Sequence, residues 1–223
     1  MQNRKAMNGM SAAVEALRQI DPEVIAAYPI TPATGIPEGY SKILAEGKVT
    51  GELITVESEH SALSACVGAA ACGVRTATAT ASQGLAYMFE VLGVASGLRL
   101  PMLMYIGNRA LSAPINIHCD HSDSMAARDQ GWLQFYCENA QEVYDLSFIA
   151  LRLAEEVKLE LEKQVKALRK KAIAEVSLRN NCCLLVTRSL SEAVEMANKI
   201  APEHLELSID NPSDWVEKVN NAG

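Results

Sequence analysis

The feature that most constrains the fold is a regular alternation of strand-like and helix-like patterns along the first 156 residues. Short strand-like segments, which are apolar, alternating or rich in Thr and Ala, alternate with stretches of helical length. Parallel strands need a crossover, usually a helix, so this alternation predicts an α/β fold with a mostly parallel sheet flanked by helices. The predicted strands are Val24–Tyr28, Glu52–Glu57, Arg75–Ala81, Met102–Gly107 and Trp132–Cys137. The predicted helices are Ser11–Ile20, Thr34–Ala45, Ser61–Cys72, Gly84–Ser96 and Gln141–Glu156.

Composition excludes several functional classes. Of the 223 residues, 49% are apolar and 21% are charged, which is too apolar for a disordered chain, and no apolar run is long enough to span a bilayer. The net charge of −7 argues against a nucleic-acid partner, because phosphate contacts need clustered Lys and Arg. The six cysteines lie in a chain that can bury a large core, and the N-terminus has no apolar signal segment. We therefore expect a cytoplasmic protein with reduced thiols.

Charge divides the chain near residue 156. Residues 1–156 hold 17 acidic and 10 basic side chains, which account for the whole net charge, whereas residues 157–223 hold 10 of each. We therefore predict two domains with this boundary, the second being a small α/β fragment. Its predicted elements are a helix over 157–180, a strand over 182–187, a helix over 191–200 with a capping box at Ser189, and a short helix near residue 211.

Four polar segments are expected at one edge of the sheet, where the parallel strands end. They follow four of the predicted strands and are Pro29–Thr34, Glu57–His60, Ser82–Gly84 and Asn108–Arg109. In open α/β sheets, ligands bind in the crevice at this edge. We expect the Thr31 hydroxyl, the backbone N–H groups of Ser82–Gly84 and the Arg109 guanidinium to face a ligand, the last suiting a substrate carboxylate.

Each of these segments also has a plainer interpretation. The two prolines around Thr31 fit a rigid turn at a strand exit. Glu59, at a helix start, can be only a partner of the helix dipole, worth about 0.3–1 kcal/mol. If it is buried, however, it needs a protonated or hydrogen-bonded partner, such as a heterocyclic ring nitrogen. Arg109 fits a surface ion pair equally well.

Two further clusters contain chemically versatile side chains. His118-Cys-Asp-His121-Ser-Asp123 has metal-binding residue types, but its spacing matches no closed zinc pattern, so we predict a solvated loop or subunit contact and no metal site. Glu203 and His204 are adjacent and fit an acid–base pair, or a capping or surface pair. The sequence has no GxGxxG motif, no GxxxxGKS or GxxxxGKT motif, and no Gly-Asp-Gly stretch with a following Asn. We therefore expect no self-contained nucleotide or Mg²⁺–diphosphate site.

Five segments match one known family, in order and without large gaps. They are Tyr28-Pro-Ile-Thr-Pro32, Val56-Glu-Ser-Glu-His-Ser61, Thr78-Ala-Thr-Ala-Ser-Gln-Gly84, residues 108–116 and residues 120–132. Residues 8–156 thereby resemble the α chain of pyruvate:ferredoxin oxidoreductase (pyruvate synthase), in its first domain, which binds the pyrimidine of thiamin diphosphate. The resemblance implies a Pyr-type thiamin-diphosphate fold. It also implies a cytoplasmic enzyme of anaerobic metabolism that converts pyruvate and coenzyme A to acetyl-CoA and CO₂ and reduces ferredoxin.

The resemblance implies roles for individual residues. Glu59 falls on the cofactor-activating glutamate, whose carboxylate stabilises the protonated pyrimidine N1′, so that the 4′-amino group removes the thiazolium C2 proton. Thr31 and Arg109 fall on the residues that bind the 2-oxo acid. The residues expected to line the cofactor pocket are Pro29, Ser82 and Gln83. In this family a β chain supplies Mg²⁺ and the diphosphate half of the site, and other subunits supply iron–sulfur clusters, so we expect the chain to be incomplete alone.

Residues 159–223 resemble a second family, as an internal piece of histidinol dehydrogenase. The resemblance lies in Leu161-Glu-Lys-Gln, residues 173–178 and residues 190–207. Glu203 and His204 match the acid–base pair of that zinc enzyme, which oxidises histidinol with NAD. Because the piece lacks the family's zinc ligands and most of its NAD-binding fold, we expect no histidinol oxidation. The alternatives to an oxidoreductase subunit are therefore a non-catalytic assembly module, a chimera, or a residual histidinol dehydrogenase.

Overall fold

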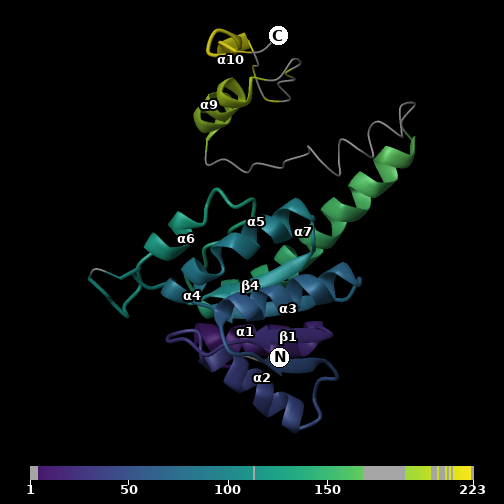
Figure 1. The fold of residues 1–223 in the computed structure, drawn as a ribbon, viewed down its shortest axis with the longest axis vertical. Helices are drawn as coiled ribbons and strands as arrows, with labels where there is room; N and C mark the ends of the chain where they lie inside the picture. Colours follow the sequence, from purple (N-terminus) through teal and green to yellow (C-terminus); the bar gives the residue numbers. More distant parts are fainter. Residues whose placement is uncertain are drawn as a thin grey trace. The chain divides into compact units, whose positions relative to one another are not determined.

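The protein divides into two compact units, Met1–Cys183 and Leu184–Gly223. A computed structural model describes residues 5–112, 114–167, 189–201, 205, 209, 211 and 213–221 (Figure 1). Within these residues, no helix combines the length and the apolar character needed to cross a membrane.

A four-stranded sheet forms the centre of the first unit (Figure 1). The strands are β1 (Val24–Ala27), β2 (Glu52–Thr55), β3 (Thr76–Thr80) and β4 (Met102–Ile106). Their order is β2-β1-β3-β4, and every neighbouring pair is parallel. Helices connect successive strands, which confirms the α/β fold with a mostly parallel sheet that the sequence predicts.

Helices cover both faces of this sheet. The first face carries α1 (Gly9–Ile20), α2 (Gly35–Ala45) and α7 (Ala140–Ala167), and the second carries α3 (Glu59–Ala71), α4 (Ser82–Tyr87) and α5 (Phe89–Gly97). Neighbouring residues of one strand enter opposite cores: Ile25 packs with the first set of helices and Ala26 with the second. This period of two explains why β1 is apolar on both of its faces, whereas the fully buried β3 alternates Thr with Ala.

The small residues of α3 let this helix lie directly on the sheet. Ala62, Cys66 and Ala70 are almost completely buried against it. The Cys66 thiol donates to the backbone oxygen of Ala77 on β3 (3.4 Å), and burial raises the pKa of this thiol to about 11. The four cysteines in the described residues, Cys66 among them, form no disulfide.

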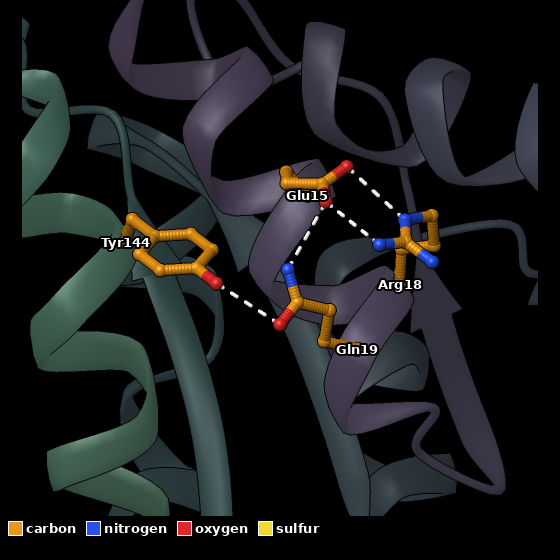
Figure 2. Close-up of polar contacts among 4 residues, drawn as sticks. All are labelled: Glu15, Arg18, Gln19 and Tyr144. Carbon is orange, nitrogen blue, oxygen red and sulfur yellow. Dashed lines mark hydrogen bonds and ion pairs between the residues drawn. The ribbon is translucent and has the colours of Figure 1, made fainter. Parts of the chain in front are cut away.

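Polar contacts fasten α7 to α1, as Figure 2 shows. The Tyr144 hydroxyl on α7 donates to Gln19 Oε1 (2.9 Å), and Gln19 Nε2 donates to Glu15 Oε1 (3.0 Å). Arg18 donates to both oxygens of the same carboxylate, at 3.1 and 2.8 Å. The hydrogen bond from Arg18 is the main reason why the pKa of Glu15 falls to about 2. Glu15 thus orients Gln19, the residue of this network that Tyr144 of α7 contacts.

The strand predicted at Trp132–Cys137 is wrong. The segment has no regular structure, and the side chains of Leu133, Phe135 and Tyr136 are 41%, 41% and 42% exposed. Its apolar residues fall on both faces of the expected strand, so the pattern specifies no buried face that would fix a pairing register. Trp132 anchors the segment instead, because its Nε1–H donates to the backbone oxygen of Leu92 on α5 (3.0 Å).

Helical predictions differ in three places. The single helix predicted over residues 84–96 is two helices, α4 and α5, which meet at the fully buried Met88. A short helix, α6 (Ser122–Ala126), begins inside residues 118–123, for which the sequence predicts a solvated loop. α7 continues without a break through residue 156, where we predict a domain boundary. That boundary stays a prediction.

The second unit contains two described helices, α9 (Leu190–Ile200) and α10 (Ser213–Val216). The Ser189 Oγ accepts a hydrogen bond from the backbone N–H of Glu192 (3.2 Å), which confirms the predicted N-cap of α9. The strand predicted over 182–187 lies outside the described residues, as does part of the helix predicted over 157–180.

Candidate functional site

The carboxyl ends of the four strands lie along one edge of the sheet, since all four strands are parallel. At this edge Ala27 pairs with Thr55, and Thr80 pairs with Ile106. The polar segments that follow the strands therefore leave the sheet next to one another, as the sequence predicts. These four segments, residues 29–34, 57–60, 82–84 and 108–109, are called the rim below.

Arg109 joins two of the rim segments. Its Nη1 donates to the backbone oxygen of Thr31 (2.6 Å), and its Nη2 donates to Gln83 Oε1 (2.9 Å). Neither acceptor is a carboxylate, so these contacts do not form the surface ion pair of the plainer interpretation. Its Nε is buried and has no hydrogen-bond partner in the described part of the chain. The two bonds leave one N–H on each terminal nitrogen for a further acceptor.

Ser82 and Gln83 are the first two residues of α4, at the tight turn that follows β3. Ser82 is fully buried and has a φ of 45°, a left-handed conformation that is uncommon for a residue with a side chain. Its hydroxyl oxygen lies 2.5 Å from both the Ala110 backbone oxygen and Gln83 Oε1. A guanidinium has no acceptor, so Arg109 must face Oε1 of Gln83 rather than Nε2. The buried Nε2 of Gln83 then has no partner among the described residues.

Glu59 begins α3, whose N-cap is Ser58. Its side chain lies against α4: a Cβ added to Gly84 would be 2.8 Å from Glu59 Cγ and 2.9 Å from its Oε1. Glycine at this position therefore makes room for the partly buried carboxylate, which receives no hydrogen bond from the described residues. The Gly84 N–H donates to the Ala81 backbone oxygen (2.8 Å), so the prediction that it is free for a ligand is wrong.

A buried carboxylate that sequence reasoning missed holds two rim segments together. Asp123, on α6, is 2% exposed. Its Oδ2 accepts from the backbone N–H groups of Ser82 (2.9 Å) and Arg109 (3.1 Å), and its Oδ1 accepts from Asn108 Nδ2 and the Ser124 N–H, both at 2.7 Å. The prediction of a solvated loop is therefore wrong for Asp123. The prediction of a free N–H is wrong for Ser82 as well, because this group already has an acceptor.

The remaining candidates do not join the rim contacts. Pro29 is exposed at the end of β1. His118 and Cys119 are exposed, which agrees with the solvated loop predicted for them. No three side chains capable of binding a metal ion come together within the described residues. Glu203 and His204 lie outside the described residues.

A model of one protein family matches most of the chain. The family is described as "Pyruvate flavodoxin/ferredoxin oxidoreductase, thiamine diP-bdg", and the match covers residues 15–204. It includes all four rim segments. It also continues past residue 156, where the charge distribution predicts a boundary.

Curated relatives agree with this match. The chain is 57% identical over 152 residues to "Pyruvate synthase subunit PorA" of Thermotoga maritima, which covers 68% of this chain and 39% of that protein. It is 58% identical over 162 residues to the protein of the same name from Pyrococcus furiosus, covering 73% and 41%. It is 49% identical over 154 residues to "Ketoisovalerate oxidoreductase subunit VorA" of Pyrococcus furiosus, covering 69% and 39%. The chain thus spans about two fifths of the length of these relatives.

A solved structure has a similar fold. It is the 2-oxoglutarate:ferredoxin oxidoreductase from Magnetococcus marinus, with 2-oxoglutarate, coenzyme A and succinyl-CoA bound. The TM-score is 0.60 with 25% sequence identity, and the similarity covers 66% of this chain and 27% of that one. On the family match and these relatives, the chain belongs to the pyruvate flavodoxin/ferredoxin oxidoreductase family, in its thiamine diphosphate-binding domain.

Proposed function

We propose that this chain contributes the pyrimidine-binding domain of a pyruvate:ferredoxin oxidoreductase, which converts pyruvate and coenzyme A to acetyl-CoA and CO₂ and reduces ferredoxin. The proposal rests mainly on the contacts of Arg109. Two neutral acceptors hold its guanidinium at the rim, and N–H groups remain available for a ligand. We propose pyruvate rather than a branched 2-oxo acid as the substrate, because identity is 50–58% to the pyruvate synthase subunits and 48–49% to the ketoisovalerate oxidoreductase subunits.

The residues at the rim fit thiamin diphosphate. Gly84 leaves the Glu59 carboxylate room beside α4, and no described residue donates to that carboxylate. A protonated ring nitrogen is the kind of partner that a partly buried carboxylate needs. We propose that Glu59 holds a proton at the pyrimidine N1′, and that Pro29, Ser82 and Gln83 line the pocket. When bound, thiamin diphosphate supplies a carbanion-stabilising centre for the decarboxylation of a 2-oxo acid.

Arg109 is proposed to bind the carboxylate of the 2-oxo acid. One N–H on each terminal nitrogen remains after the bonds to Thr31 and Gln83, and two such donors suit a carboxylate. The bonds to the two neighbours hold the guanidinium in one orientation before a substrate arrives, so less ordering is needed on binding. Thr31 is proposed to contribute to the same subsite from the end of β1.

Partner chains are proposed to complete the site. By resemblance to the family, a β chain supplies Mg²⁺ and binds the diphosphate, and an iron–sulfur subunit passes electrons to ferredoxin. We place this assembly in the cytoplasm. The alternative of a non-catalytic assembly module makes a different prediction, since calorimetry with thiamin diphosphate and the β chain would then give no heat beyond subunit association.

The division of the chain also remains a proposal. We propose that residues 1–156 form the thiamin diphosphate-binding domain and that residues 157–223 form a separate segment. None of the relatives named above is a histidinol dehydrogenase, and the family match runs through residue 204. The comparisons therefore do not support the resemblance of the second segment to histidinol dehydrogenase, or an acid–base role for Glu203 and His204.

Substitution of Glu59 tests the proposal in the chain assembled with its β and iron–sulfur partners. Glu59→Gln keeps the shape of the side chain but removes the charge, so we expect pyruvate-dependent ferredoxin reduction to fall at least about a hundredfold. The matched control is Glu52→Gln, since Glu52 is exposed on β2 and outside the rim. Wild-type activity in Glu59→Gln, or an inactive assembly of wild-type chains with thiamin diphosphate bound, would overturn the proposal.

A further inference from the structure

Asp123 links the ends of two neighbouring strands through a single oxygen atom. Its Oδ2 accepts the N–H of Ser82, which follows β3, and the N–H of Arg109, which follows β4. All four groups that donate to the carboxylate are neutral, being three backbone N–H groups and the Asn108 amide. Its bonds therefore fix backbone positions rather than neutralise a charge.

Only a carboxylate can satisfy these four donors. Each carboxylate oxygen of Asp123 accepts two hydrogen bonds. An asparagine has one acceptor oxygen and one NH₂ group that only donates. In either orientation its NH₂ group would face two of these donors, and one of the two is a buried backbone N–H, of Ser82 or of Ser124, which would lose its acceptor. The residue type at position 123 is thus dictated by the backbone around it.

The contacts of Asp123 extend to the guanidinium of Arg109 along two routes. One is direct, through the backbone N–H of Arg109. The other runs through Ser82, whose left-handed backbone is held by its N–H bond to Asp123 and by the contact of its hydroxyl with Ala110. Ser82 precedes Gln83, which accepts from Arg109 Nη2. Release of Ser82 into a more common conformation would move Gln83 and with it the guanidinium.

We propose that Asp123 is a positioning residue of the 2-oxo acid subsite: its carboxylate fixes the backbone of Ser82 and Arg109, so that Gln83 and Arg109 present the guanidinium to the substrate carboxylate. Asp123 acts through these neighbours and does not touch the substrate. This inference rests on the proposed function of Arg109, and it adds the residue that determines where Arg109 lies.

Steady-state kinetics of the assembled enzyme test this inference. For Asp123→Asn we expect the KM for pyruvate to rise about ten- to a hundredfold, with a smaller change in kcat and none in the KM for coenzyme A. The control is Asp129→Asn, the same change at a 78%-exposed side chain, which should keep wild-type constants. An unchanged KM for pyruvate, or an equal rise for pyruvate and coenzyme A, would overturn the inference.

Hydrogen exchange on the full chain separates a failure of this inference from a failure of the proposed function. Asp123→Asn should speed amide exchange in residues 80–85 and 107–111 while α1 keeps its protection. If the wild-type assembly is inactive, the proposed function fails. The amide exchange rates then decide by themselves whether Asp123 fixes the backbone at Ser82 and Arg109. Unchanged exchange in both segments would show that it does not.

A second variant covers the case in which Asp123→Asn fails to fold. Asn108→Ala removes one donor from Asp123 Oδ1 but keeps the carboxylate and its bonds to Ser82 and Arg109. It should raise the KM for pyruvate in the same direction but less, by about two- to fivefold. Wild-type KM in this variant, with faster exchange in neither rim segment, would contradict the positioning role.

Discussion

Two carboxylates organise polar networks in this protein, and they differ in burial and in the distance of their partners along the chain. Glu15 lies on α1 with a 24%-exposed side chain, and its donors are three and four residues away. Asp123 is 2% exposed, and it accepts from Ser82, 41 residues earlier in the sequence. Water can replace the partners of Glu15 but not those of Asp123. The first network should therefore add little stability, whereas the second should determine the shape of the rim.

The largest effect is expected from loss of the buried carboxylate. Asp123→Asn turns an NH₂ group toward two donors and leaves a buried backbone N–H without an acceptor, which should lower the free energy of unfolding by about 3 kcal/mol. Urea unfolding of the chain measures this. Asp129→Asn, on the exposed side chain, should stay within about 0.5 kcal/mol of the wild type. If Asp123→Asn and Asp129→Asn were equally stable, burial of the Asp123 carboxylate would not make its hydrogen bonds more important than those of an exposed carboxylate.

A smaller loss is expected at the contact between α4 and Glu59. Gly84→Ala would place a Cβ 2.9 Å from Glu59 Oε1 and even closer to Thr80 Oγ1, and the resulting overpacking should cost about 1–3 kcal/mol. Gly68→Ala is the matched control, because nothing lies within 4 Å of a Cβ there and alanine favours the helix, which should gain about 0.5–1 kcal/mol. A melting temperature of Gly84→Ala that equals or exceeds that of the wild type would contradict the close approach of Thr80 and Glu59 to Gly84.

The exposed network should give a modest and pH-dependent effect. The pKa of Glu15 is lowered to about 2, chiefly by the hydrogen bond from Arg18, so its contribution is present above pH 4.5 and lost as the pH falls toward 2. After solvent screening, Glu15→Gln should cost about 0.5–1 kcal/mol at pH 7 and almost nothing at pH 2. Unfolding curves at both values measure this, with Glu52→Gln as the control. A cost that persists at pH 2 would mean that charge is not its source.

The smallest effect is expected at the outer end of the same network. Tyr144→Phe removes the exposed hydrogen bond to Gln19 and should cost no more than about 0.5 kcal/mol. Tyr87→Phe provides the comparison, since Tyr87 is 59% exposed and its hydroxyl has no hydrogen bond in the described part of the chain. A loss above about 1.5 kcal/mol on guanidinium unfolding would show that the contact between α1 and α7 depends on this single bond.

Local sequence patterns predicted the four strands and the edge of the sheet at which they end. Two strands of the sheet follow from apolar runs, β2 follows from an alternating pattern and β3 from a Thr/Ala pattern. The rim follows from the rule that parallel strands end at one edge. The strand predicted at Trp132–Cys137 failed because pairing depends on a neighbouring strand, which a local pattern does not reveal. Residue-type reasoning placed Arg109 at the rim but left an ion pair open as its role.

Asp123 shows what local patterns miss. It stands in a polar segment with His118 and Cys119, which are exposed, and nothing in its immediate sequence distinguishes it from them. Its burial results from donors that follow β3 and β4, so it becomes visible only once the sheet has formed. The positive φ of Ser82 has the same origin, because the acceptor that holds this turn lies on a later element.

Substitution of Arg109 by lysine tests whether its guanidinium binds the substrate carboxylate. Lysine keeps the charge but lacks the planar pair of donors, so Arg109→Lys in the assembled enzyme should raise the KM for pyruvate at least about tenfold. Arg128→Lys, at a 51%-exposed side chain outside the rim, is the matched control and should leave the KM unchanged. A wild-type KM for pyruvate in Arg109→Lys would contradict the proposed role of the rim.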